Sequence, residues 1–253
     1  MTYLLLLINR ILKLYCFCAL CSADPAMPLP WCTRNVLPTL VLGKGRSNMN
    51  LKPPSYTDHV TGIILSGGKN SRMGGRNKAF IEFEGERLID RSVRLFQSLF
   101  DEVILITNSP QEYLDLGVAL VADIYQNKGA LGGIHAGLFH ATNEKVFFAA
   151  CDMPFLNEAL IKHMIDLSAE FDILVPQSPD GLQPLHAIYS RKCLPVIEKL
   201  FSQDRLKIIG FYPGYTIHKI TADTLIQFDP EWRMFSNLNS LEEMGKIVPE
   251  NNG

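Results

Sequence analysis

The amino-acid sequence predicts an α/β fold in which a mostly parallel sheet is covered by helices on both faces. Three observations lead to this prediction. From residue 60 onward, short and almost continuously apolar runs alternate with amphipathic stretches. The runs are rich in β-branched and aromatic residues, which is typical of strands that are buried on both faces. The order strand, helix, strand then repeats, and crossovers of this kind connect parallel strands.

The composition supports one folded domain of this class. The chain has 253 residues, of which 47% are hydrophobic and 20% are charged, and its formal net charge is −2. These values exclude a disordered or collagen-like chain. The balanced charge also gives no reason to expect nucleic acid or an anionic membrane as a partner.

The first part of the chain differs from the remainder. Residues 1–56 contain six Lys or Arg residues against a single acidic residue, and four of the six cysteines. Their Leu-rich opening is interrupted by Asn9, Arg10 and Lys13, which makes it a poor membrane span and an irregular secretory signal. We therefore expect an N-terminal extension outside the fold over 1–56, a single domain over 57–253, and a cytoplasmic location.

Two further features bear on this extension. Met49 offers a second start, from which a short polar and Pro-rich lead enters the first strand, and we expect the functional protein to begin there. The cysteines of the extension suggest a metal site as an alternative. They lie in a Leu-, Phe- and Tyr-rich run without the glycine turn of structural zinc sites, which favours translated upstream sequence. These cysteines are Cys16, Cys18, Cys21 and Cys32.

The expected elements follow in chain order. Strands are predicted at 60–65, 102–107, 118–122, 145–150, 172–176 and 185–190. Helices are predicted at 87–100, 131–141, 157–169, 192–201 and 241–247. In the first of these helices, Leu88, Val93 and Phe96 lie along one stripe, and polar residues lie largely off it. After residue 180 the periodicity is less clear.

A parallel sheet usually binds its ligand beyond the carboxyl ends of its strands. The residues directly after the first five predicted strands are therefore candidates for the functional site. They are Ser66 and Gly67, Asn108, Asp123, Cys151 and Asp152, and Gln177.

The segment from Leu65 to Lys78 carries the densest set of chemical groups. It follows a buried strand and contains four glycines together with Lys69, Arg72, Arg76 and Lys78. Glycines let backbone N–H groups approach an anion closely, and the cations complete a cradle for phosphates. The spacing matches neither a Walker A loop nor G-x-G-x-x-G. An ordinary glycine-rich turn between strand and helix is the alternative.

Two carboxylates follow predicted strands. Asp152 comes after an apolar run and before Met153 and Pro154, a placement that suits Mg²⁺ held jointly with substrate phosphates. A turn or helix-capping Asp is the alternative. Asp123 can accept hydrogen bonds from ribose hydroxyls or from the N–H groups of guanine, or it is a solvated turn residue. We expect Cys151 to be a small buried residue, because no basic partner is evident for a nucleophilic thiol.

These residues resemble a known family. The segment TGIILSGGKNSRMGGRNK at 61–78 resembles the signature of the molybdenum cofactor guanylyltransferases, which are MobA-type nucleotidyltransferases. Further matches follow in the family's order. They are Asp123, GALGGI at 129–134, CDMPF at 151–155, QPL at 183–185 and FSNLNSLEEM at 235–244. The first motif is shared with cytidylyl- and sugar-nucleotide transferases, whereas QPL and the N-x-N segment make the guanylyl assignment more specific.

The resemblance implies a Rossmann-like fold of nucleotidyltransferase type that joins GTP to molybdopterin and releases pyrophosphate. It implies GTP-binding roles for Leu65, Ser66, Gly67, Lys78, Asp123 and Asp152, with Asp152 also binding Mg²⁺. Lys78, Arg72 and Asp152 would be the catalytic residues. Gln183, Asn237 and Asn239 would lie on the pterin side. One departure is visible, because this chain has Ile106 where some members carry Asn, with Asn108 two residues on.

The chemistry agrees with this assignment. The nucleophile would be the terminal phosphate of molybdopterin, which is already ionised near neutral pH, so no general base is needed. Catalysis then depends on positioning and on charge neutralisation. Expected partners are GTP, molybdopterin, and molybdoenzymes or cofactor chaperones that receive the product. Two alternatives stay open: a related transferase that uses CTP or a sugar or polyol phosphate, and a non-catalytic pterin-cofactor binding protein.

Overall fold

The computed structural model describes residues 59–67, 72–73 and 76–237, and at 72, 73 and 76 it describes the backbone alone. Several predictions lie outside the described residues. They are the extension over 1–56 with Met49 and its four cysteines, the helix at 241–247, Asn239, and the side chain of Arg72.

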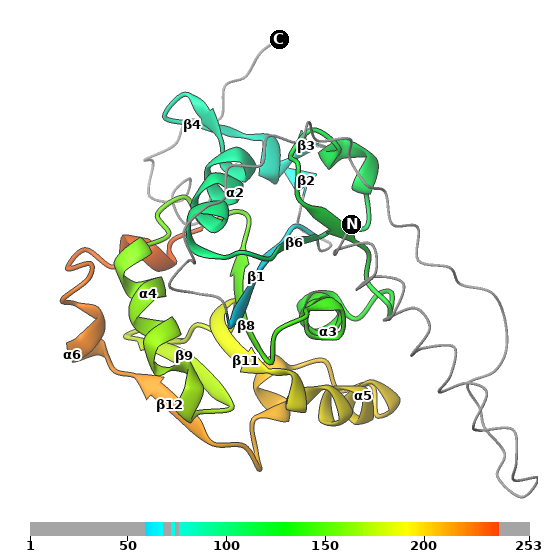
Figure 1. Cartoon of the computed structure of the whole chain (residues 1–253), viewed down its shortest axis with the longest axis vertical. Helices are drawn as coiled ribbons and strands as arrows, with labels where there is room; N and C mark the ends of the chain where they lie inside the picture. Colours follow the sequence, from blue (N-terminus) through cyan, green and yellow to red (C-terminus); the bar gives the residue numbers. More distant parts are fainter. Residues whose placement is uncertain (1–58, 68–71, 74–75, 238–253) are drawn as a thin grey trace, which may run out of the picture. The chain divides into compact units, whose positions relative to one another are not determined.

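One sheet organises the described residues (Figure 1). Its strands are β1 (Val60–Leu65), β6 (Val103–Ile106), β7 (Ala119–Val121), β8 (Lys145–Ala150), β9 (Ile173–Ser178), β10 (Gly181–Leu182), β11 (His186–Ser190) and β12 (Ile217–Ile220). They run in the order β10-β9-β11-β8-β1-β6-β7, with β12 also paired to β9. The pairs β8-β1, β1-β6, β6-β7 and β9-β12 are parallel. The predicted fold class, with its mostly parallel sheet, is confirmed.

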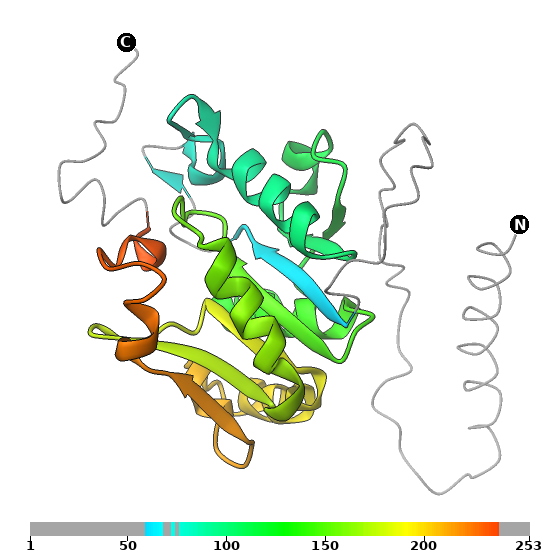
Figure 2. The same ribbon diagram turned by 60° about the vertical axis from the view of Figure 1, so that its left-hand side comes forward.

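The helices cover both faces of this sheet. One face carries α2 (Leu88–Leu99), α4 (Glu158–Leu167) and α6 (Ala222–Leu225), and the other carries α3 (Gly129–His140) and α5 (Leu194–Ser202). Figure 2 shows α4 lying across the front of the strands. Shorter 3₁₀ helices connect these elements. They are η2 (Lys78–Phe80), η3 (Pro110–Tyr113), η4 (Ser168–Glu170), η5 (Arg191–Cys193), η6 (Ile208–Phe211) and η7 (Arg233–Phe235).

The strands form because both of their faces are buried. Successive side chains of a strand point to opposite faces of a sheet. Ile64 and Phe147 accordingly pack in the core beneath α2 and α4, whereas their neighbours Ile63 and Phe148 pack in the core beneath α3 and α5. All four side chains are fully buried. This two-sided burial explains why the sequence shows continuous apolar runs and no polar alternation.

The structure extends the predictions in the second half of the chain. The strand expected at 185–190 is β11, and it runs antiparallel between β8 and β9. Neither β12 nor α6 was predicted, since each has four residues and no clear period. Two small hairpins were also missed. One pairs β2 (Arg72–Met73) with β3 (Arg76–Asn77), and the other pairs β4 (Glu82–Phe83) with β5 (Glu86–Arg87).

Within the described part of the chain, no helix combines the length and the apolar character that crossing a membrane requires.

Two glycines allow the helices to approach the sheet closely. A Cβ atom added at Gly62 of β1 would lie 2.5 Å from Cδ2 of Phe100 and 2.8 Å from Cδ1 of Phe96. A Cβ atom added at Gly137 of α3 would lie 2.5 Å from Cε1 of Phe148. The three rings are buried in well-packed cores and have no room to move aside.

We therefore predict that Gly62→Ala lowers the free energy of unfolding by about 1–3 kcal/mol, the usual cost of overpacking. Gly210→Ala is the matched control, because its added Cβ would meet Leu200 at an ordinary 3.4 Å. Urea unfolding of both variants measures the difference. Equal stability of the two variants would show that the packing of α2 on β1 is not tight.

Candidate active site

The carboxyl ends of four neighbouring strands form one edge of the sheet. Leu65, the last residue of β1, lies opposite Ile106 of β6 on one side and opposite Ala150 of β8 on the other. Main-chain hydrogen bonds continue past the strand ends. The N–H of Ser66 donates to the carbonyl of Ile106 at 2.9 Å, and the N–H of Cys151 donates to the carbonyl of Leu65 at 3.0 Å. The segments after these strands are therefore held side by side.

Lys78 and Asp152 lie together at this edge. Lys78 is in η2 and its side chain is buried, whereas Asp152 follows β8 and is partly buried. Burial raises the pKa of the Asp152 carboxyl, and the positive charge of Lys78 acts in the opposite direction. The charge of Lys78 also acts on the neighbouring Cys151, and because such interactions weaken with distance, Lys78 lies near the end of β8. The structure thus brings together a cation and a carboxylate that are 74 residues apart in the sequence.

Asn77 fixes the segment that carries Lys78. Its side-chain Oδ1 accepts a hydrogen bond from the N–H of Ala79 at 3.1 Å and so caps η2. Its Nδ2 donates to Oη of Tyr113 at 2.7 Å and to Oε2 of Glu112 at 2.8 Å. The side chain of Ala79 is fully buried in the core. Lys78 therefore stands on an anchored turn, between a capping residue and a core residue.

Asp123 stands at the same edge, after β7. Nδ2 of Asn108 donates to its carboxylate at 2.9 Å, and the backbone N–H of Asp123 donates to Oδ1 of Asn108 at 3.1 Å. Burial raises the pKa of Asp123, while the hydrogen bond from Asn108 and the charge of His135 lower it. The residue at the position of the family's Asn, Ile106, is buried in the core instead. The exposed amide that reaches Asp123 belongs to Asn108.

The first turn of α3 packs against this corner. A Cβ atom at Gly133 would lie 3.0 Å from Cδ2 of Leu65 and 3.8 Å from Oδ1 of Asp123, and one at Gly132 would lie 3.1 Å from the carbonyl oxygen of Tyr125. Glycine at these positions is what lets the helix start approach β1 and Asp123. The backbone N–H groups of such a helix start favour a negatively charged ligand.

Two of the three predicted pterin-side residues, Gln183 and Asn237, lie in described segments near the same edge. Because β11 is antiparallel to β8, it begins beside the carboxyl end of β8, with His186 opposite Ala149. The QPL segment that leads into β11 therefore reaches the same edge as Asp152. Nε2 of Gln183 donates to Oγ of Ser178 at 2.9 Å. The segment that ends in Asn237 passes close by, since the rings of Phe235 and His186 are 5.4 Å apart.

Cys151 has no role as a nucleophile in this arrangement. Its side chain is buried, as predicted, and burial raises the pKa of its thiol to about 12. The thiol is therefore neutral near neutral pH, and a neutral thiol is a poor nucleophile. It donates a hydrogen bond to Oγ of Ser66 at a Sγ···Oγ distance of 3.4 Å.

Sequence reasoning missed Tyr113 and Asn77. Tyr113 lies in η3, far along the chain from the glycine-rich segment, and its hydroxyl is 2.6 Å from Oγ of Ser66. No local pattern indicates this contact, because a Tyr between predicted elements has no distinctive spacing. Asn77 stood within the signature but was not singled out, although its place before Lys78 could have suggested a cap.

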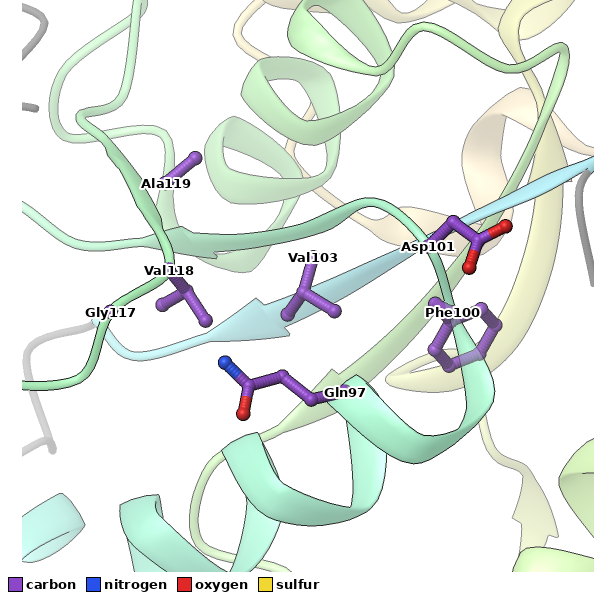
Figure 3. A pocket seen from close by; sticks show the side chains of 7 residues that line it. All are labelled: Gln97, Phe100, Asp101, Val103, Gly117, Val118 and Ala119. Carbon is purple, nitrogen blue, oxygen red and sulfur yellow. The ribbon is translucent and has the colours of Figure 1, made fainter. Parts of the chain in front are cut away.

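A hollow of about 300 Å³ lies elsewhere, between the end of α2 and the amino ends of β6 and β7 (Figure 3). Gln97, Phe100, Asp101, Val103, Gly117, Val118 and Ala119 line it. The amino ends of parallel strands are opposite to the edge described above. This hollow is therefore separate from the candidate active site.

Comparison with known proteins identifies the family. Residues 62–210 match the family model of the MobA-like NTP transferase domain. The chain is 41% identical, over 190 residues, to a molybdenum cofactor guanylyltransferase of Desulfosudis oleivorans, which covers 75% of this chain and 94% of the relative. It is 34% identical to a probable molybdenum cofactor guanylyltransferase of Clostridium perfringens, over 73% of this chain and 94% of the relative.

Solved structures share the fold. Molybdopterin-guanine dinucleotide biosynthesis protein A of Archaeoglobus fulgidus superimposes with a TM-score of 0.62 at 22% identity, covering 74% of this chain and 95% of that one. The 4-diphosphocytidyl-2C-methyl-D-erythritol synthase of Anaerococcus prevotii gives a TM-score of 0.56 at 13% identity, covering 75% and 94%. With the family model and the sequence relatives, these comparisons show that the chain belongs to the MobA-like NTP transferase family, alongside the molybdenum cofactor guanylyltransferases.

Proposed function

We propose that this protein transfers GMP from GTP to the terminal phosphate of molybdopterin, releasing pyrophosphate and forming the guanine dinucleotide cofactor. The proximity of Lys78 and Asp152 at the shared carboxyl edge of β1 and β8 carries the proposal. The relatives named above, which match most of this chain, support the choice of GTP and molybdopterin.

The reaction joins two anions. An oxygen of the acceptor phosphate forms a bond to the α-phosphorus of GTP as the bond to pyrophosphate breaks. The acceptor oxygen is already ionised near neutral pH, so the site needs groups that hold and neutralise charge and no general base. In the proposal, Lys78 and Arg72 contact the phosphates, and the backbone of Leu65, Ser66 and Gly67 lines the nucleotide.

Asp152 fits a divalent cation such as Mg²⁺. Its ionised form is disfavoured by burial, and Lys78 compensates this only in part, because the pKa of Asp152 stays above its ordinary value of 3.8. A divalent cation that is shared with substrate phosphates would stabilise the ionised form of such a buried carboxyl. Mg²⁺ bound there would neutralise charge that develops on the phosphate oxygens.

Asp123 and Asn108 suit the nucleoside part of GTP. A carboxylate accepts hydrogen bonds from ribose hydroxyls or from the N1–H and N2–H₂ groups of guanine, and an amide both donates and accepts. Gln183 and Asn237 lie toward the β11 side of the edge, and we assign them to the pterin. Molybdoenzymes or cofactor chaperones would then receive the product.

The experiment that tests this function measures pyrophosphate release with molybdopterin and each of GTP, CTP and ATP. We expect Mg²⁺-dependent release with GTP alone, accompanied by formation of the guanine dinucleotide. Turnover with CTP in preference to GTP, or tight pterin binding without any turnover, would contradict the proposal.

We predict that Asp152→Ala lowers Mg²⁺-dependent GMP transfer by about 10²–10³-fold or more, as loss of one charge-stabilising group commonly does. Asp166→Ala is the matched control, since Asp166 is an exposed carboxylate on α4. Initial rates and circular dichroism of both variants provide the measurement. Near-normal turnover by a correctly folded Asp152→Ala protein would refute the assigned role.

The raised pKa of Asp152 also predicts a pH-dependent effect on stability. The folded protein binds the proton of this carboxyl more tightly than the unfolded chain does, so this group makes stability fall as the pH rises through the window between 3.8 and the folded pKa. Asp152→Asn replaces the carboxyl by a neutral amide and so removes the free-energy cost of ionising a buried group. The stability of the metal-free Asn variant relative to the wild type should therefore increase as the pH rises through this window, and should stay at that higher level above it.

Urea unfolding of both proteins without Mg²⁺ or nucleotide, from about pH 3 to about pH 8, measures this difference. Asp166→Asn is the control, because its exposed carboxyl carries no such burial cost. A wild type that gains stability over the Asp152→Asn variant with rising pH would contradict the prediction.

A further inference from the structure

Four side chains form a continuous hydrogen-bond network at the carboxyl ends of the strands, where the proposed nucleotide site lies. Sγ of Cys151 lies 3.4 Å from Oγ of Ser66, Oγ of Ser66 lies 2.6 Å from Oη of Tyr113, and Nδ2 of Asn77 lies 2.7 Å from the same Oη. The four residues come from four places in the chain: Ser66 follows β1, Tyr113 lies in η3 after β6, Cys151 follows β8 and Asn77 precedes η2. This network thus connects the end of β1 to the segments that follow its two neighbouring strands, β6 and β8.

The direction of these hydrogen bonds follows from counting protons. Oδ1 of Asn77 accepts from the N–H of Ala79, so the other end of the amide, Nδ2, must be the donor to Tyr113. Burial raises the pKa of Tyr113, so its hydroxyl keeps its proton near neutral pH. In the contact between Cys151 and Ser66, the thiol is the donor and Oγ of Ser66 is the acceptor.

The hydrogen bond between Ser66 and Tyr113 can run in either direction, because either hydroxyl can donate. Among the described residues, the Tyr113 hydroxyl contacts only Ser66 and Asn77. Asn77 is a donor to it. If Ser66 also donated, the hydroxyl hydrogen of Tyr113, whose side chain is 1% exposed, would be buried without an acceptor among these residues. A buried donor left unpaired costs about 1–3 kcal/mol. Tyr113 is the more deeply buried of the two residues, at 1% exposed against 5% for Ser66, and Ser66 stands at the edge of the sheet, where a ligand can accept its hydrogen. We therefore assign the donor role to Tyr113 and the acceptor role to Ser66.

Ser66 consequently accepts from both Cys151 and Tyr113. With two hydrogen bonds accepted, its own hydroxyl hydrogen is directed away from both donors. Ser66 stands directly after β1, at the edge where the strands end and where the glycine-rich segment begins. The ring of Tyr113 is held in turn by Phe80, at a centroid distance of 4.9 Å.

We propose that Tyr113 is a positioning residue that aims the Ser66 hydroxyl, as a hydrogen-bond donor, at an acceptor atom of the bound nucleotide. The inference rests on the proposed function, in that the nucleotide is taken to be GTP. It adds to that function a side-chain contact from Ser66 and a residue, Tyr113, that acts through Ser66 without touching the ligand.

The test is a double-mutant cycle on GTP affinity, measured by calorimetry with Mg²⁺ and without the pterin acceptor. Ser66→Ala removes the donor and should weaken GTP binding by about tenfold. Tyr113→Phe leaves the donor present but no longer oriented, and should weaken binding by about threefold. In the Ser66→Ala background, Tyr113→Phe should have no further effect, because the group that Tyr113 positions is absent.

Tyr212→Phe is the matched control. Tyr212 is also a buried tyrosine with a hydrogen-bonded hydroxyl, which lies 2.9 Å from Oη of Tyr189 in the core beneath α3 and α5. Removal of the Tyr212 hydroxyl should leave GTP affinity unchanged. Equal losses of affinity in Tyr113→Phe and Tyr212→Phe would indicate a general effect of buried hydroxyls and would overturn the inference.

Two other outcomes would also overturn it. Unchanged affinity in Tyr113→Phe would show that Tyr113 does not act on the nucleotide, and the proposed function would stand. A Tyr113→Phe effect that persists in the Ser66→Ala background would show that Tyr113 acts by another route, such as Asn77 and Lys78. Failure of the wild type to bind GTP would instead refute the proposed function, and this inference with it.

Discussion

The alignment of the carboxyl ends of β8, β1 and β6 is the constraint on which the site depends. The main-chain hydrogen bonds from Cys151 to Leu65 and from Ser66 to Ile106 extend the sheet by one residue beyond the strands. They bring chain segments that are far apart in sequence to within contact distance. In the proposed function, Lys78, Asp123 and Asp152 act on one ligand because their backbones are part of, or are anchored to, the same edge.

Much of this arrangement could be predicted from the sequence, for identifiable physical reasons. The strands at Val60–Leu65 and Lys145–Ala150 match the prediction at both ends, because burial on both faces leaves a short and nearly continuous apolar run. The direction of β11 could not be predicted, since an antiparallel strand buried on both faces has the same composition as a parallel one. The link from Tyr113 to Ser66 depends on tertiary distance alone, which no local pattern encodes.

The electrostatic state of the site follows from the same burial. Asp123 and Asp152 both have pKa values raised by desolvation, and the neighbours that oppose this effect compensate it only in part. A structure optimised for stability alone would pair or expose these carboxylates. Their partial compensation is typical of sites whose remaining interaction energy is supplied by a ligand.

If Asp123 binds the nucleoside as proposed, its hydrogen bonds with Asn108 have a consequence for base selection. The two residues are hydrogen-bonded to each other. The side-chain amide of Asn108 donates to the carboxylate of Asp123, and the backbone N–H of Asp123 donates to the amide oxygen of Asn108. An incoming nucleoside must compete with this internal partner, so entry is an exchange of one set of hydrogen bonds for another. Discrimination among bases would then be set by how completely each base replaces what the amide already provides, and a poorly matched base would leave the protein's own pairing undisturbed.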